Sequence, residues 1–354
     1  MSWFRTARRA PEPVASMLPA VESPIAHVVG PAVLSLDSGR LMHANEDGDK
    51  QATVLIDGLE LLACHGRVTI TPECLAALLE KNVGVAFFTA NGSRLVARLT
   101  PEGDPRLIGR VMQHQMLADE PSRSFLARAI VAEKIHSQAA AARHYQRQGK
   151  PVTGDQLKNF AALEKRADEA TSLPELLGLE GTASAAWFAV FAKLLAAPWE
   201  FPARSRRPPR DPVNAVLSLG YTMLYHRLVA AIQAFGLEPG LGALHAYRAG
   251  RQSLACDLME PLRVPIVDRW VIGLLNQRRV APDDFLAADD VGVRLTKEAF
   301  PRVIADWERQ WDDSRSASVV MDRIRAFSRE LRKRADPPLR IKRELAAVGI
   351  DELA

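Results

Sequence analysis

The chain has 354 residues, of which 47% are hydrophobic, so enough apolar side chains are present to bury a sizeable core. Its formal net charge is +4, and with so small an excess a polyanionic partner must be argued from where the charges lie. The three cysteines lack Cys-x-x-Cys spacing, which argues against a thiolate zinc site and indicates a reducing compartment. No apolar run reaches the roughly 18 residues of a membrane helix, so we expect no membrane-spanning segment.

The first third of the chain predicts a small β-rich domain. Residues 1–30 contain prolines and arginines but no apolar signal-peptide core, and we expect them to form a disordered extension. Residues 31–110 are predicted to form the β-rich domain. Its expected strands are 32–36, 51–56, 68–70, 83–89 and 94–99, with a hairpin turn at Asn91-Gly92 and one helix that begins after Thr71 with Pro72.

From residue 107 the pattern becomes helical. Amphipathic helices are expected over 125–145 and 156–167, and further helices separated by prolines and glycines continue to about residue 334. We therefore predict an α+β protein, with the small N-terminal β-rich domain followed by a larger all-α metal-binding catalytic domain over 111–336 and a tail over 337–354. The sequence lacks a Walker A loop, Gly-x-Ser-x-Gly and His-Glu-x-x-His, which argues against three common hydrolase chemistries.

One histidine and two carboxylates lie in the apolar stretch 241–269. Asp257 and Glu260 are three residues apart and share a helix face, where they repel each other unless a cation lies between them. With His245 they offer a mixed oxygen and nitrogen ligand set, which suits Mg²⁺ or Mn²⁺. The competing interpretation is two solvated acids at a helix N-terminus and a histidine in the core.

Three motifs resemble those of a known family, the CRISPR-associated integrases, which are the universal endonuclease/integrase subunit of spacer acquisition. The first is Leu179-Glu180-Gly181-Thr182-Ala183, and the second runs from Asp211-Pro212-Val213-Asn214 to Gly220-Tyr221. The third comprises Gly242 to His245, Gly250 to Leu254, Asp257-Leu258-Met259-Glu260 and Asp268-Arg269. Their order and spacing extend the resemblance over about residues 50–300.

The resemblance implies an active site for this chain. Glu180, His245 and Glu260 would be the catalytic metal ligands for Mg²⁺ or Mn²⁺, and Asp257 would be an additional ligand or would orient His245. Some family members have aspartate where this chain has Glu260. Arg251, Arg263, Arg248 and Asn214 would contact DNA, although each arginine also fits a solvated helix face.

Two basic stretches lie outside these motifs. Arg204, Arg206, Arg207 and Arg210 place four arginines in seven residues of a proline-stiffened loop, which we expect to follow a DNA backbone. The stretch 323–343 holds nine basic residues, but its interspersed acids fit a solvated helix about as well as a DNA arm.

The resemblance also implies the reaction and the partners. We expect a metal-dependent DNA integrase/endonuclease of the prokaryotic cytoplasm that inserts short foreign DNA fragments into a CRISPR repeat array by 3′-hydroxyl transesterification. Expected partners are double-stranded DNA, a second copy of this chain, and a small ferredoxin-like adaptation protein. The alternatives are a metal-dependent nuclease that acts on branched or single-stranded DNA and a catalytically silent DNA-binding scaffold. Residues 134–138 match a family Lys-x-x-Asn-Gln pattern only loosely, and the first 30 residues and the tail match nothing.

Overall fold

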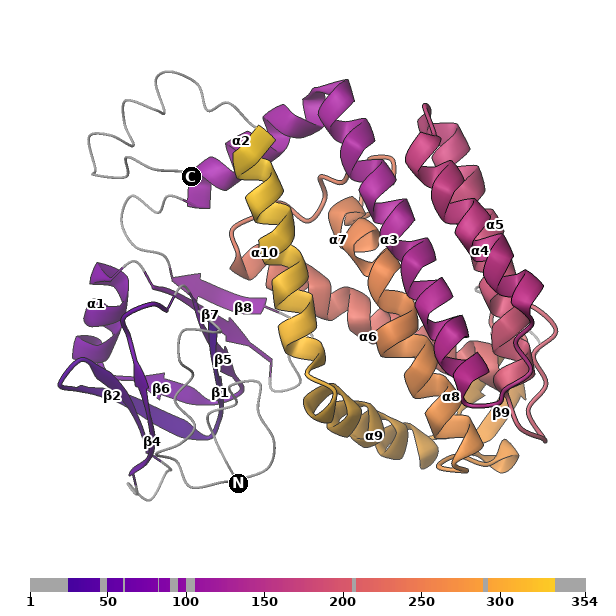
Figure 1. Cartoon of the computed structure of the whole chain (residues 1–354). Helices are drawn as coiled ribbons and strands as arrows, with labels where there is room; N and C mark the ends of the chain where they lie inside the picture. Colours follow the sequence, from indigo (N-terminus) through magenta and orange to yellow (C-terminus); the bar gives the residue numbers. More distant parts are fainter. Residues whose placement is uncertain are drawn as a thin grey trace. The chain divides into compact units, whose positions relative to one another are not determined.

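The computed structural model describes residues 25–44, 50–59, 61–81, 83–89, 95–99, 106–205, 208–288 and 292–334. An N-terminal β region is followed by a mostly helical region (Figure 1). The chain divides into two compact units. One consists of Gln115–Tyr225 and Pro239–Ser316, and the other contains the remaining described residues.

Two four-stranded sheets form the β region. The first has the order β1 (Ile25–Val29), β5 (Leu61–His65), β7 (Gly84–Phe88) and β8 (Leu95–Leu99). In it β1, β5 and β7 are parallel, and β8 is antiparallel to β7. The second has the order β4 (Lys50–Leu55), β3 (Arg40–Ala44), β2 (Ala32–Asp37) and β6 (Val68–Ile70). Its β2–β3 and β3–β4 pairs are antiparallel, and its β2–β6 pair is parallel.

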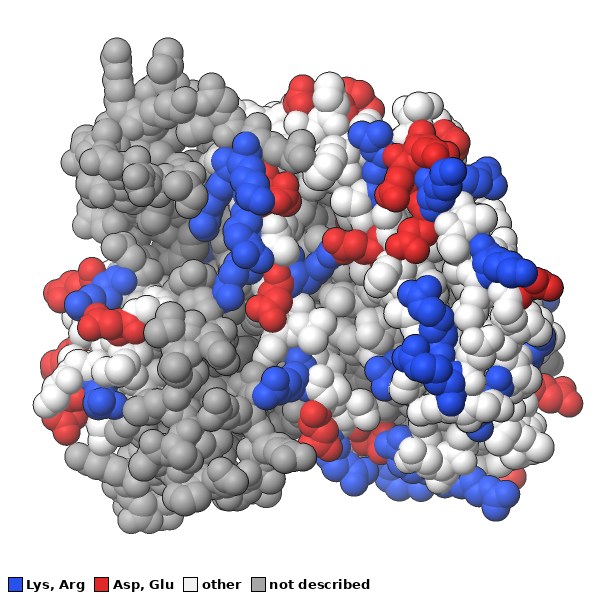
Figure 2. Space-filling view, in the orientation of Figure 1, with Lys and Arg blue, Asp and Glu red and all other residues white. Residues whose placement is uncertain are grey.

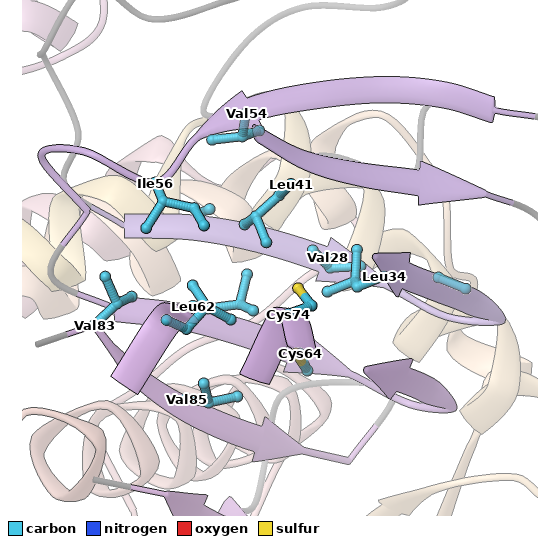
Figure 3. Close-up of a cluster of buried hydrophobic side chains, with 13 residues drawn as sticks. Val28, Leu34, Leu41, Val54, Ile56, Leu62, Cys64, Cys74, Val83 and Val85 are labelled. Carbon is cyan, nitrogen blue, oxygen red and sulfur yellow. The ribbon is translucent and has the colours of Figure 1, made fainter. Parts of the chain in front are cut away.

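The two sheets and helix α1 (Pro72–Glu80) share one apolar core (Figure 3). Its members come from both sheets and from the helix, and they include Val28, Leu62, Val85, Leu34, Leu41, Cys74 and Leu78. Burial, reinforced by neighbouring Cys74, raises the pKa of the Cys64 thiol to about 12. A thiol with so high a pKa is a poor nucleophile and metal ligand, so this cysteine acts as a small core residue.

Most local predictions for this region are confirmed. Each predicted strand matches an observed one to within one residue, and α1 begins as expected, because Thr71 Oγ1 accepts a hydrogen bond from Cys74 N at 3.3 Å. The Asn91-Gly92 turn lies outside the described residues. Strands β3 and β5 were not predicted. The disordered extension predicted for residues 1–30 is wrong over β1, which pairs with a strand 36 positions along the chain, Ile25 opposite Leu61. Residues 1–24 lie outside the described residues, as do 335–354.

The compact unit that contains the sheets is discontinuous in sequence. It includes His226–Glu238, the end of helix α6 (Pro212–Ala234) and the residues that follow. Gln113 in helix α2 (Arg106–Ala118) donates to Glu238 O and accepts from Glu238 N, both at 2.9 Å. Arg110 Nε donates to Gly236 O at 2.8 Å. The boundaries expected from sequence, 31–110 and 111–336, treated each domain as one contiguous stretch.

The other unit is built mainly from helices. They are α3 (Glu120–Arg147), α4 (Gly154–Glu169), α5 (Leu173–Leu194), the first part of α6, α7 (Ser253–Met259), η2 (Glu260–Leu262), η3 (Arg263–Asp268), α8 (Arg269–Asn276), η4 (Pro282–Asp284) and α9 (Ala299–Asp313). Helix α10 (Ser316–Arg334) follows. The predicted helices 125–145 and 156–167 correspond to α3 and α4. The α4 start has a capping box, in which Thr153 and Gln156 satisfy each other's backbone N–H groups.

One irregular helical stretch runs from α7 through η2 and η3 to α8. Within it a 3₁₀ turn is followed by a π-helix, and Pro261 and Pro265 fall in these two segments. Proline lacks the N–H that a regular α-helix needs, so hydrogen-bond register changes at these points. The changed register places Glu260, Arg263 and Asp268 together around one cavity.

The helical part also contains strands. β9 (Phe285–Ala288) and β10 (Gly292–Leu295) form an antiparallel ribbon, so the expectation of an all-α domain over 111–336 is wrong in this detail. Helix α6 is long and apolar enough to cross a membrane by length and composition, although no membrane-spanning segment was predicted. In this structure 61% of its most apolar stretch is buried, as in the core helix of a globular protein.

Candidate active site

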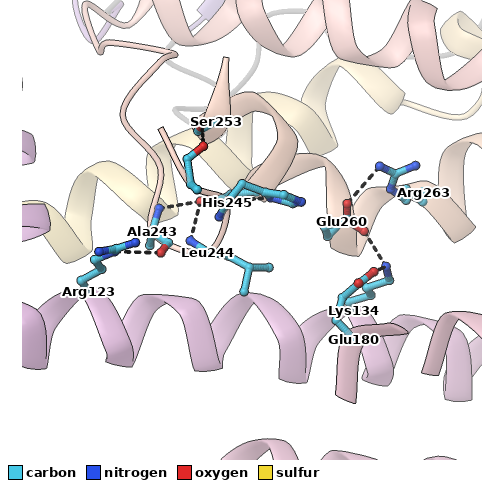
Figure 4. A network of polar contacts seen from close by, with 11 residues as sticks. Arg123, Lys134, Glu180, Ala243, Leu244, His245, Ser253, Glu260 and Arg263 are labelled. Atoms are coloured by element: carbon cyan, nitrogen blue, oxygen red, sulfur yellow. Dashed lines mark hydrogen bonds and ion pairs between the residues drawn. The ribbon is translucent and has the colours of Figure 1, made fainter. Parts of the chain in front are cut away.

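Two glutamates from different elements meet at one lysine (Figure 4). Lys134 Nζ on α3 forms ion pairs with Glu180 on α5 and with Glu260 at the start of η2, the latter at 2.6 Å. The side chains of Lys134 and Glu260 are only 5% and 4% exposed, and that of Glu180 is 22% exposed. The two predicted metal ligands therefore reach a common point, and an ammonium group occupies it.

Glu260 is held as a carboxylate by two cations. Its Oε1 accepts from Arg263 at 2.9 Å, and its Oε2 accepts from Lys134. Burial opposes ionisation, but the charges and hydrogen bonds of these two neighbours outweigh it and lower the pKa of Glu260 to about 2. The carboxylate is therefore charged at neutral pH.

A polar layer made of Asp268, Tyr221 and Trp187 adjoins Arg263. Asp268 accepts from Tyr221 Oη at 2.5 Å and from Trp187 Nε1 at 2.7 Å. Burial raises the pKa of Asp268 to about 6 despite these hydrogen bonds. The Tyr221 ring contacts the guanidinium of Arg263, 4.6 Å from its centroid.

A cavity of about 20 Å³ adjoins this layer, and it has room for one water molecule. Lys134, Gln138, Glu260, Arg263 and Asp268 are among its lining residues. Two buried polar atoms on these residues, Gln138 Oε1 and Arg263 Nε, have no hydrogen-bond partner among the described residues.

The helices that carry this layer approach closely at Gly220. A Cβ there would lie 2.6 Å from Val267 Cγ1 and 3.1 Å from Trp270 Cζ3. Glycine at this position lets α6 lie against η3 and α8, and the next residue, Tyr221, then reaches Asp268. This contact gives a physical reason for the Gly220-Tyr221 pair in the second motif.

His245 is positioned by the buried carboxylate of Asp257. The backbone N–H groups of Ala243 and Leu244 donate to Asp257 Oδ2 at 2.6 and 3.0 Å, and His245 N donates to Oδ1 at 3.0 Å. His245 Nδ1 lies 2.6 Å from the same Oδ1. A carboxylate only accepts, so Nδ1 carries a proton, and in the neutral ring Nε2 is the free ligand atom. A Cβ on Gly242 would lie 2.5 Å from Asp257 Oδ2, so the loop can approach the carboxylate only with glycine there.

The predicted DNA contacts fall into two groups. Arg204 is directed inward: it donates to Asn214 Oδ1 at 2.7 Å and to Ser218 Oγ at 3.1 Å. Asn214 is fully buried and also donates to Ala203 O at 2.8 Å. Arg263 likewise lies inside, against Glu260. These three therefore have structural contacts in this protein.

The other predicted contacts lie nearer the surface. Arg210 and Arg248 are exposed and Arg251 is half-buried, whereas Arg206 and Arg207 lie outside the described residues. Figure 2 shows blue side chains gathered along α10, with red ones among them. Mixed charges there fit both interpretations of residues 323–334, and residues 335–343 lie outside the described part of the chain.

Comparison with known proteins decides the family. A family model described as CRISPR associated protein Cas1 matches residues 27–309. The chain belongs to the Cas1 family. A protein named CRISPR-associated endonuclease Cas1 3, from Thermus thermophilus, is 36% identical over 282 residues, which are 78% of this chain and 81% of the relative. The resemblance stated from the three motifs is confirmed.

Solved structures agree on the fold of this Cas1 family member. A casposase bound to integration product has a TM-score of 0.70 at 21% identity, covering 87% of this chain and 94% of that one. A chain of a partial Cas6-RT-Cas1–Cas2 complex has a TM-score of 0.69 at 26% identity, covering 89% and 98%.

The side chains of this candidate site can be compared with those that bind divalent metals. Glu180 and Glu260 converge on one point, and His245 is held by Asp257. Two carboxylates and an imidazole are a donor set that suits Mg²⁺ or Mn²⁺. In the part of the chain that the structure describes, no three His, Cys, Asp or Glu side chains come together as a metal site, and Lys134 lies between the two glutamates. The residue types fit a metal, and assembly of the full set requires the ammonium to move.

Three residues of this cluster, Lys134, Tyr221 and Asp268, lie within the sequence motifs but were not predicted to be site residues. A signal was present for Lys134, because Ile130, Lys134 and Gln138 follow each other at i+4 spacing on a buried face of α3. A lysine on such a face is buried only with a partner, which points to a carboxylate elsewhere in the chain.

Proposed function

We propose that this Cas1 family member is a metal-dependent DNA integrase/endonuclease that inserts short foreign DNA fragments into a CRISPR repeat array. The observation that carries the proposal is the convergence of Glu180 and Glu260 on a single cation position, with His245 anchored by Asp257. Family membership supports it, as does the shared fold with a casposase bound to integration product and with a chain of a Cas1–Cas2 complex.

Glu180, Glu260 and His245 would hold Mg²⁺ or Mn²⁺. The bound ion would polarise a phosphate and lower the pKa of an attacking oxygen. Asp257 keeps the His245 imidazole in the tautomer whose Nε2 can ligate. The exposed Arg210 and Arg248 and the half-buried Arg251 would bind backbone phosphates.

In the proposed reaction the 3′-hydroxyl of the fragment attacks a phosphodiester at the edge of a repeat. One P–O bond forms to the fragment and one breaks to the repeat strand, and the proton lost by the attacking hydroxyl is balanced by the one that the released 3′-oxygen gains. No covalent enzyme intermediate and no net hydrolysis are involved.

Proposed partners are double-stranded DNA, a second copy of this chain, and a small ferredoxin-like adaptation protein, in the prokaryotic cytoplasm. The solved Cas1–Cas2 complexes support a protein partner.

A second candidate activity uses the same residues. If water replaces the 3′-hydroxyl, the enzyme is a nuclease for branched or single-stranded DNA, as the name endonuclease of the relatives suggests. A catalytically silent scaffold would bind DNA without either reaction. The convergence of Glu180 and Glu260 disfavours the scaffold, because two carboxylates at one buried point are of no use to DNA binding alone.

The three possibilities give different products with a labelled fragment and a repeat plasmid in Mn²⁺. Strand transfer joins the label to the plasmid, cleavage shortens the fragment, and a scaffold only shifts its mobility. Glu260→Ala should abolish joining, and the matched control Glu169→Ala, which removes an exposed carboxylate paired with Lys165 at 3.8 Å, should not. Wild-type joining by Glu260→Ala would refute the metal-ligand assignment.

A further inference from the structure

The ammonium of Lys134 occupies the position that a metal must take. It contacts both glutamates, and it is almost fully buried. A divalent ion cannot bind between Glu180 and Glu260 while the Lys134 ammonium is there, because two cations a few ångström apart repel each other strongly inside a protein. Metal binding therefore requires the lysine to have a second position that is both polar and reachable.

The cavity beside Lys134 offers such a position. Gln138 lies one helical turn further along α3, so its side chain leans back towards Lys134. Gln138 lines this cavity, and its Oε1 is buried and accepts no hydrogen bond from any described residue. An orphaned buried acceptor carries a free-energy penalty that a donor would remove. Asp268 also lines this cavity, and an acidic residue there favours a cation.

We propose that Lys134 is an exchangeable internal cation. A divalent ion takes the place of its ammonium between Glu180 and Glu260, and the ammonium moves into the cavity, where Gln138 Oε1 accepts from it. In the metal-free protein the lysine keeps the two carboxylates from repelling each other. In the metal-bound protein Gln138 is the positioning residue that receives it. This inference rests on the metal dependence of the proposed function.

The test is a double-mutant cycle read by Mn²⁺ binding to the full chain, measured by calorimetry. Gln138→Met removes the acceptor at similar volume, and Lys134→Met removes the ammonium at similar length. With Lys134 present, Gln138→Met should weaken Mn²⁺ binding about tenfold, which is about 1.4 kcal/mol. With Lys134→Met already present, the same change should alter the Mn²⁺ affinity less than twofold, because there is no ammonium to receive.

Thermal melts in EDTA separate exchange from a merely structural role. Gln138→Met should melt at or above the wild-type temperature, since it deletes an unpartnered polar atom. Lys134→Met should melt lower in EDTA and gain more from Mn²⁺ than wild type does. Lys134→Gln, which keeps a neutral donor for the carboxylates, serves as the background if the methionine variant does not fold.

The possible failures are distinct. An equal effect of Gln138→Met in both backgrounds, or no effect in either, overturns the exchange and leaves the proposed function standing. If wild type and Lys134→Met both fail to bind Mn²⁺, the exchange falls together with the metal dependence of the proposed function.

Discussion

Replacing Asp257 by asparagine should release the loop that carries His245. In the native protein Oδ2 accepts from the N–H groups of Ala243 and Leu244, and Oδ1 accepts from the N–H and ring of His245. Asparagine keeps one oxygen. If its NH₂ group takes the place of Oδ1, the His245 ring can switch tautomer and accept from it, so only the hydrogen bond from His245 N is lost. A hydrogen bond to a charged group is worth about 1.5–3 kcal/mol, so local opening of the loop becomes easier by about 1.5–3 kcal/mol.

Amide hydrogen exchange followed by mass spectrometry measures this directly. A change of about 1.5–3 kcal/mol corresponds to roughly ten- to hundredfold faster exchange at residues 243–245. The melting temperature should fall by less than it would if the whole protein lost about 1.5–3 kcal/mol of its free energy of unfolding, because the loop opens before the helices unfold. Asp155→Asn is the control: this side chain is 91% exposed and pairs with Lys158 at 3.4 Å, so its removal should change stability by no more than about 0.5 kcal/mol. Wild-type protection of residues 243–245 in Asp257→Asn would refute the anchoring role.

Three further predictions concern packing, pH and DNA. Gly220→Ala should lower the free energy of unfolding by about 1–3 kcal/mol, because its Cβ would overlap Val267. The control is Gly178→Ala on α5, where a Cβ meets nothing within 4 Å, and it should raise that free energy by up to about 1 kcal/mol. Equal denaturant midpoints for Gly220→Ala and wild type would contradict the packing role of Gly220. The pKa of Asp268 is about 6 in the folded state and 3.8 in the unfolded state. Between these pH values the folded protein keeps the Asp268 proton that the unfolded chain loses, so the free energy of unfolding should fall as pH rises from about 4 to about 6. The full span is about 3 kcal/mol and should vanish in Asp268→Asn, and chemical denaturation at several pH values checks it. Replacing exposed Arg210 by alanine should reduce the slope of log affinity against log salt by about 0.9 on duplex DNA, whereas Arg204→Ala should mainly lower stability; an unchanged slope for Arg210→Ala removes that contact.

Local signals in the sequence located much of the fold. Thr71 followed by Pro72 marked the start of α1, and alternating or continuous apolar runs marked five strands, because caps and periodicity act over a few residues. Strand β1 was missed for the opposite reason. Its stability comes from β5, and nothing in its five residues distinguishes it from an unpaired apolar stretch.

The candidate site shows the same division. Glu180, His245 and Glu260 were predicted because each belongs to a short motif, and the structure brings the two glutamates together at Lys134. The role of Lys134 depends on partners 46 and 126 positions away, which no local pattern specifies. Arg204 and Arg210 look alike in the sequence, and only the fold shows that the first faces Asn214 while the second faces solvent.

The Asp257 anchor divides the loop after Gly242 into two parts with different freedom to change. Its first residues are fixed through backbone N–H groups to a carboxylate on α7, so their geometry depends little on their own side chains. Tyr247, two residues beyond the histidine, is 52% exposed, and Arg248 is exposed beside it. Mutations at these outer positions can alter what the loop contacts without moving the His245 imidazole. A loop of this design can change its outer contacts one residue at a time while the histidine stays in place.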